Sequence, residues 1–100
     1  MSLNTGVIPG YSFLNITAAA PTTTVVKTGA GILHTLTFTK PVATGVVTIY
    51  DNTAASGTIV GTITVPASPQ PVTLVFDAAL STGLTIVTAT AAQDITVTYV

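Results

Sequence analysis

Apolar and hydroxyl-bearing residues alternate along much of this chain. Four runs show the alternation most clearly: "ILHTLTFT" at 32–39, "TIVGTITV" at 58–65, "VTLVF" at 72–76 and "DITVTY" at 94–99. In the last run, Ile95, Val97 and Tyr99 fall on one side of an extended chain, and Thr96 and Thr98 fall on the other. A period of two residues is typical of a β-strand that buries one face, so each run predicts a strand of a half-buried antiparallel sheet.

The same period assigns a buried face to the other three runs. The residues predicted to face the core are Ile32, Leu36 and Phe38, with His34 in phase with them, then Ile59, Ile63 and Val65, and then Val72, Leu74 and Phe76. Thr, Val and Ile are abundant throughout and favour strands. No segment has the spacing of an amphipathic helix over three turns. We therefore expect little helix.

Turn-forming residues separate the predicted strands. They lie in "KTGAG" at 27–31, "KPVATG" at 40–45, "DNTAASG" at 51–57, "PASPQP" at 66–71, "LSTG" at 80–83 and "TAAQD" at 90–94. This spacing predicts about seven or eight short strands in an all-β fold, a single antiparallel β-sandwich of jelly-roll-like or immunoglobulin-like topology. We assign residues 21–100 to this domain. Residues 1–20 alternate poorly, so they are predicted to form an extended N-terminal arm or a first strand.

Charged residues are rare: the chain has Lys27, Lys40, Asp51, Asp77 and Asp94, and no Glu or Arg. They make up 5% of the chain, against about 25% in ordinary domains. Two lysines cannot neutralise a row of phosphates, so no nucleic-acid partner is expected. Strand edges are normally protected by charges or proline, and few charges are present here. We therefore expect other subunits to cover the edges and the apolar surface, in a homo-oligomer or a larger assembly.

Membrane insertion and cysteine chemistry are not expected. The uncharged stretch 52–76 is long enough to cross a bilayer, but several Gly and Pro residues interrupt it, and these would break a helix. The first thirteen residues lack the basic and apolar regions of a secretory signal. The chain has no cysteine, which excludes thiolate zinc sites and disulfides. These features predict no membrane partner and a chain that is cytosolic or assembled there.

Asp51, Asn52, Ser56 and Gly57 form the most polar loop, which suggests either a metal site or a turn. A calcium loop needs several oxygen ligands, commonly including two or more carboxylates, and this loop has one. Asp and Asn after a strand also bond to nearby backbone groups, and Gly permits a positive φ. We predict a turn, with no metal site and no cofactor.

His34 is the residue best suited to acid–base catalysis. With Asp77 or Asp94 and a serine it would form a catalytic triad, but the chain has no G-x-S-x-G motif. A lone His in phase with apolar residues is more often a core or interface residue. We therefore assign no catalytic residue, no small-molecule substrate and no enzymatic activity.

Two binding functions remain as alternatives. A carbohydrate-binding module would gather exposed aromatic residues such as Tyr11, Tyr50 or Tyr99 in one cleft. An ice-binding protein would present a flat and regular rank of threonines. The Thr pairs at 35/37, 62/64 and 96/98 share no short period of the kind that builds such a solenoid.

From Lys27 to Val100 the chain resembles small virion proteins of tailed bacteriophages. The resemblance rests on "KTGAGILHTL" at 27–36, "TIYDNTAASGTIV" at 48–60, "VFDAALSTGLTIV" at 75–87 and the final "ITVTYV" at 95–100. Small structural proteins of these phages use Thr-, Val- and Ala-rich strands that end in an aromatic residue. These are strand and turn motifs, and they bring no catalytic residue with them.

The resemblance implies a capsid decoration or cement protein that binds between major capsid proteins and stabilises the head. Such proteins form homo-oligomers, with a trimer favoured, and clamp their neighbours with extended arms, for which residues 1–20 are the candidate. The implied location is the capsid surface of the virion, after assembly in the host cytoplasm. The alternatives are a tail, fibre or head–tail joining component, or a small carbohydrate-binding β-sandwich module.

Overall fold

The computed structural model describes residues 10–100, in which every regular element is a β-strand. The strands are β1 (Ser12–Ile16), β2 (Thr22–Thr28), β3 (Gly31–Lys40), β4 (Val46–Tyr50), β5 (Ile59–Thr64), β6 (Val72–Leu80), β7 (Gly83–Ala89) and β8 (Asp94–Tyr99). The eight strands agree with the seven or eight expected from the spacing of the turns. This part of the chain contains no apolar helix of membrane-spanning length.

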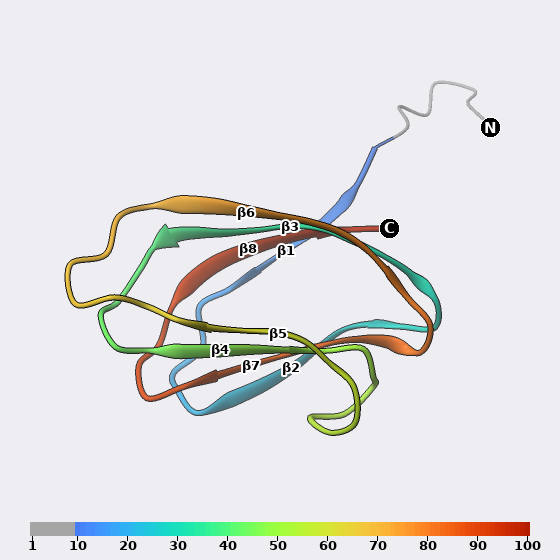
Figure 1. Ribbon diagram of the computed structural model, residues 1–100, viewed down its shortest axis with the longest axis horizontal. Coiled ribbons are helices and arrows are strands. Elements are labelled where there is room, and N and C mark those ends of the chain that lie inside the picture. The colour runs from blue at the N-terminus through green and yellow to red at the C-terminus, as the bar shows by residue number, and fades with distance from the viewer. Residues whose placement is uncertain (1–9) are drawn as a thin grey trace.

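The strands form two sheets of four, with the orders β1-β8-β3-β6 and β2-β7-β4-β5. All neighbouring strands are antiparallel. Figure 1 shows the two sheets facing each other, with tight turns joining β2 to β3 and β6 to β7 at one end of the molecule. The predicted all-β, sandwich-like architecture is therefore confirmed. The edge strands are β1 and β6 in the first sheet and β2 and β5 in the second.

The core lies between the two sheets and is almost entirely aliphatic. Its buried members are Ile16, Leu33, Leu36, Phe38, Val47, Ile49, Val65, Leu80, Leu84, Ile86, Ile95 and Val97. Burial of one such side chain contributes about 1.5–3 kcal/mol to folding. The predicted inward face of β8 is confirmed, because Ile95 and Val97 are fully buried and Tyr99 packs against the cluster.

In β3, the predicted inward face is correct for Leu36 and Phe38 but wrong for Ile32 and His34. The register shifts between Leu33 and Thr35 in the pairings of β3 with both of its neighbours. A β-bulge of this kind inserts one residue and reverses the alternation of faces. Leu33 is consequently fully buried, Ile32 is 41% exposed, and His34 lies on the outer face of the sheet.

A second bulge changes the face of Ile59 in β5. Ile49 of β4 is opposite Gly61, and the next residue, Tyr50, is opposite Ile59, so Val60 is the extra residue of β5. Val60 packs against the core, whereas Ile59 is 53% exposed. The predicted inward position of Ile59 is therefore wrong.

The first strand lies within the segment 1–20 that was expected to form an arm or a first strand. β1 pairs with β8 from Ser12↔Tyr99 to Ile16↔Ile95, and Ile16 is buried in the core. Residues 1–9 of that segment lie outside the described residues.

Candidate functional site

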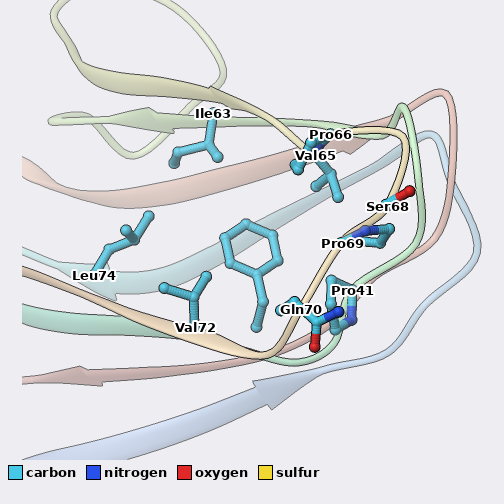
Figure 2. Close-up of a pocket in the computed structure, with 10 residues that line it drawn as sticks. Pro41, Ile63, Val65, Pro66, Ser68, Pro69, Gln70, Val72 and Leu74 are labelled. Carbon is cyan, nitrogen blue, oxygen red and sulfur yellow. The ribbon is translucent and has the colours of Figure 1, made fainter.

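An apolar groove opens between β5 and β6, the edge strands of the two sheets. The residues that line it include Ile63, Val65, Pro66, Pro69, Val72 and Leu74. Figure 2 shows these side chains surrounding the space from both strands and from the loop that joins them. The groove has a volume of about 300 Å³, and none of its lining residues is charged. This cavity, termed the β5–β6 groove below, has the chemistry to hold an apolar segment.

Sequence reasoning missed this groove. The alternation predicts Val72, Leu74 and Phe76 on the core side of β6, and Leu74 and Phe76 do pack against the core. Val72 lines the groove instead and is 47% exposed. The local signal was the proline-rich segment 66–71, because prolines are confined to strand edges and loops. The groove also needs β5 to lie beside β6, which alternation does not reveal.

The carboxylate of Asp51 binds the turn between β6 and β7. It accepts hydrogen bonds from the backbone N–H groups of Ser81, Thr82 and Gly83 at 2.9–3.3 Å and from the Ser81 hydroxyl at 3.0 Å. The backbone bonds, those of Ser81 and Thr82 foremost, lower the pKa of Asp51 to about 2. The acceptor positions of this carboxylate are thus used by the protein itself.

Asn52 and Gly57 turn the chain between β4 and β5. The Asn52 amide donates to the carbonyl oxygen of Ser56 at 2.8 Å, and its Oδ1 accepts from the N–H of Thr53 at 2.8 Å. Gly57 has a φ of +83°, a conformation that favours glycine. The turn predicted for this loop is therefore present. Residues 10–100 contain no group of three or more His, Cys, Asp or Glu side chains arranged to hold a metal ion.

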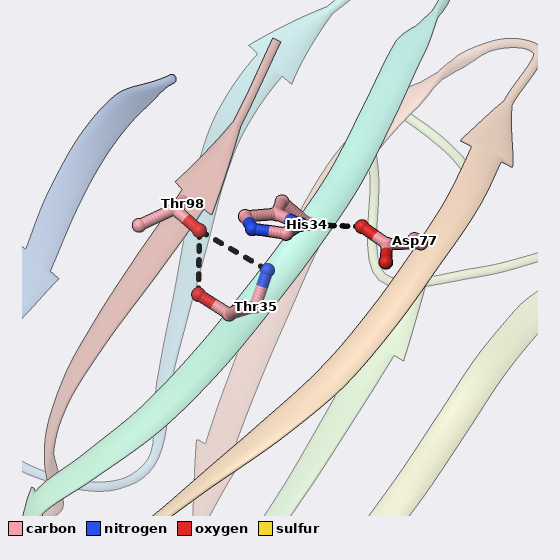
Figure 3. A network of polar contacts seen from close by, with 4 residues as sticks. All are labelled: His34, Thr35, Asp77 and Thr98. Atoms are coloured by element: carbon pink, nitrogen blue, oxygen red, sulfur yellow. Dashed lines mark hydrogen bonds and ion pairs between the residues drawn. The ribbon is translucent and has the colours of Figure 1, made fainter. Parts of the chain in front are cut away.

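His34 pairs with Asp77 and stacks on Tyr11. Its Nδ1 contacts the carboxylate of Asp77 (Figure 3). The rings of Tyr11 and His34 are 4.0 Å apart between centroids and nearly parallel, at 10°. Of the two aspartates considered for a triad, the structure thus brings Asp77 to the histidine. Among the described residues no serine hydroxyl bonds to His34, and the group lies on an outer sheet face.

Asp94 lies at the other end of the same sheet, where it joins β1, β8 and β3. Its Oδ1 accepts hydrogen bonds from the amide of Asn15 at 2.8 Å and from the hydroxyl of Thr39 at 2.7 Å. These bonds, first that of Asn15, and the nearby charge of Lys40 lower the pKa of Asp94. The arrangement explains this carboxylate as a link between strands.

Threonines form ranks across the outer face of the first sheet. Thr96, Thr37 and Thr73 are successive partners across β8, β3 and β6, and Thr98 and Thr35 are partners in the next rank. Their hydroxyls bond to one another, Thr37 to Thr73 at 2.9 Å and Thr35 to Thr98 as Figure 3 shows. Cross-strand hydroxyl pairs of this kind stabilise a sheet. In each of these two pairs, one hydroxyl therefore donates within the sheet.

The three tyrosines do not meet in one cleft. Tyr11 is half exposed beside His34, Tyr99 packs against the core, and Tyr50 lies in the other sheet on β4. The β5–β6 groove contains no tyrosine. The arrangement expected of a sugar site formed by these three residues is absent from residues 10–100.

Gln93 is a buried polar residue that sequence reasoning did not single out. It is 2% exposed. Its Oε1 accepts from the N–H of Val42 at 2.7 Å, and its Nε2 donates to the carbonyl oxygen of Val42 at 2.8 Å. The side chain therefore acts as a strand partner for the β3–β4 loop. A glutamine in a polar turn gives no sign of this role in the sequence.

Comparisons with known proteins identify no relative: no family model matches, and no curated protein or solved structure is significantly similar. The surfaces and contacts described above are therefore the basis for a functional proposal, together with the resemblance of residues 27–100.

Proposed function

We propose that this protein is a structural component of a tailed-phage particle, a capsid decoration protein that binds between major capsid proteins and stabilises the head. The observation that carries the proposal is the small number of charged residues in a protein whose surface is rich in apolar side chains. The exposed large hydrophobic residues are Tyr11, Phe13, Val25, Ile32, Val42, Ile59, Val72, Val75 and Val100. The whole chain has five charged residues, so much of this surface can be buried without leaving an ion unpaired.

The outer face of the first sheet is the surface we assign to the capsid contact. One rank of this face runs Phe13, Thr98, Thr35 and Val75 from edge to edge. Phe13 is 73% exposed and Val75 is 66% exposed. Phe13 and Val75 lie on the edge strands β1 and β6, which can also add a strand from a partner.

We further propose that the sandwich is a jelly roll rather than an immunoglobulin-like fold. The sheets pair β1 with β8, β2 with β7, β3 with β6 and β4 with β5. The first strand thus pairs with the last, the second with the seventh, and so on toward the middle of the chain. These pairs are expected when one long antiparallel ribbon of eight strands is rolled into two sheets, which is the arrangement of a jelly roll. In an immunoglobulin-like sandwich the first strand is beside the second, whereas here its neighbour is the eighth.

Immunogold microscopy tests the proposed location. Antibodies against the purified chain should label the heads of particles released from cells that carry this sequence. Val75→Lys, placed in the proposed contact face, should reduce the number of copies per head at least tenfold, whereas Thr23→Lys on the other sheet should not. Label on tails, or particles without label, would reject a decoration role.

A carbohydrate-binding module is the second candidate, because the half-exposed ring of Tyr11 stacks on His34, which pairs with Asp77. Exposed aromatic rings beside polar groups are common in sugar sites. Titration calorimetry with oligosaccharides of the host surface separates the two proposals. Binding that Tyr11→Ala abolishes would favour the module.

A further inference from the structure

The β5–β6 groove has an apolar lining and two edge strands at its mouth, yet nothing among residues 10–100 fills it. Its neutral lining offers no partner for an ion, so a charged occupant would lose its hydration without compensation. An occupant should therefore be uncharged, extended and partly apolar. Its extended backbone could pair with the free edge of β5 or β6.

The segment 1–9, "MSLNTGVIP", has these properties. It contains no charged residue and carries Leu3, Val7 and Ile8 as apolar side chains. It is joined directly to Gly10 and β1, so each molecule has both the segment and a groove.

The segment leaves the domain far from the groove of its own molecule. The register places Ser12 level with Leu33 and Ala78, whereas the groove residues Phe38 and Val72 are level with Ile16 at the other end of the strands. β1 and β6 are also opposite edges of the sheet. Five residues of strand and three strand spacings correspond to a separation of about 20 Å.

Ile8 cannot cover that separation within its own chain. It is four residues before Ser12, and four extended residues span about 14 Å at most. Val7 reaches only about 18 Å by the same measure. The groove of a second molecule has no such restriction.

We infer that the segment 1–9 docks in the β5–β6 groove of a neighbouring copy, with Val7 and Ile8 against the apolar wall. This deepens the proposed function, since it rests on the assembly role and names how the copies associate. The donor and acceptor surfaces differ, so the contact is head-to-tail and closes into a ring when the rotation between copies permits.

Cysteine cross-linking tests the contact directly, because the chain has no native cysteine. Ile8→Cys and Ser68→Cys are made as separate full-length variants, one of them labelled with ¹⁵N, and are mixed under mild oxidation. Ser68 is an exposed residue of the groove lining. Mass spectrometry should find mixed dimers with a disulfide between positions 8 and 68. In the control, Ile8→Cys is mixed with Val75→Cys, whose position on β6 is exposed on the outer face of the sheet. The yield with Ser68→Cys should be at least fivefold higher than the yield with Val75→Cys. Equal yields with both partners overturn the inference.

Sedimentation over a dilution series provides the second test. Val72→Lys puts a charge in the groove and should raise the concentration at which the copies associate at least tenfold. Val75→Lys on the same strand should leave association unchanged, although it should reduce head binding as proposed above. A dilution-independent monomer, or equal losses from both lysines, overturns groove docking. Since neither measurement uses a capsid, failure here is distinct from a failure to label heads.

Discussion

Asp51 and Ser81 are thirty residues apart in the chain, and the carboxylate of Asp51 bonds to both the backbone N–H and the hydroxyl of Ser81. The contact joins the end of β4 to the turn between β6 and β7. That turn carries the chain from one sheet to the other. A single aspartate therefore fixes the strand that precedes it and the connection between the two sheets.

The first prediction is that Asp51→Asn lowers the melting temperature at neutral pH, because an amide is a weaker acceptor for three N–H donors than a carboxylate. The pKa of Asp51 in the folded protein is about 2, below its usual 3.8. A depressed carboxyl pKa contributes stability that is complete above the unfolded value and is lost as the pH falls toward the folded value. The difference in Tm between wild type and Asp51→Asn should thus be constant above about pH 5 and shrink between about pH 4 and 2. Calorimetric scans across this pH range measure the difference in Tm. A difference that does not change with pH would contradict the lowered pKa of Asp51.

The strand positions were predictable because alternation is a property of one strand at a time. Leu36 and Phe38, or Ile95 and Val97, reveal their buried face from their own spacing. The positions of Ile32 and His34 were not predictable, because a bulge is defined by the register between two strands. The β5–β6 groove was missed for a related reason, since it is formed by two edges that meet only in the folded protein.

The second prediction concerns Gln93, whose amide satisfies both backbone groups of Val42. Gln93→Leu keeps the volume but leaves the N–H and C=O of Val42 without this partner. We expect a loss of about 1–3 kcal/mol in the free energy of unfolding. Urea denaturation measures the loss. Gln70→Leu makes the same chemical change at an exposed glutamine and should alter stability by less than about 0.5 kcal/mol. Equal effects at the two sites would show that burial of Gln93 is not the cause.

The pairing of His34 with Asp77 illustrates what sequence reasoning can and cannot supply. Two aspartates were plausible partners, and neither local pattern distinguishes them. Topology decides, because β6 is beside β3 and places Asp77 next to the bulge, while Asp94 at the start of β8 is level with Lys40. Tyr11 completes the group from the segment before β1.

The third prediction uses two buried threonines of β7 with opposite environments. The Thr88 hydroxyl is buried and has no hydrogen-bond partner within the described part of the chain, whereas the Thr85 hydroxyl donates to the carbonyl oxygen of Asn52 at 2.8 Å. Replacement of an unpaired buried hydroxyl by a methyl group removes a desolvation cost. Thr88→Val should therefore stabilise the protein by about 1 kcal/mol, and Thr85→Val should destabilise it by about 1 kcal/mol. Urea denaturation of the two variants gives both values. The same sign for both changes would contradict the hydrogen-bonding assignment.

The last prediction concerns Thr90, which follows β7 with a φ of +72°. This left-handed conformation is unfavourable for a β-branched side chain because its Cβ crowds the backbone. Thr90 is exposed, so its side chain has little packing to lose. Thr90→Gly should therefore raise the free energy of unfolding by roughly 1 kcal/mol, net of the extra freedom of glycine in the unfolded chain. Thr23→Gly, at an exposed position within β2, has no such strain to relieve and should lower it by about 0.5–1 kcal/mol. Chemical denaturation compares the two variants, and destabilisation by both would mean that the strain at Thr90 is smaller than the entropy that glycine adds.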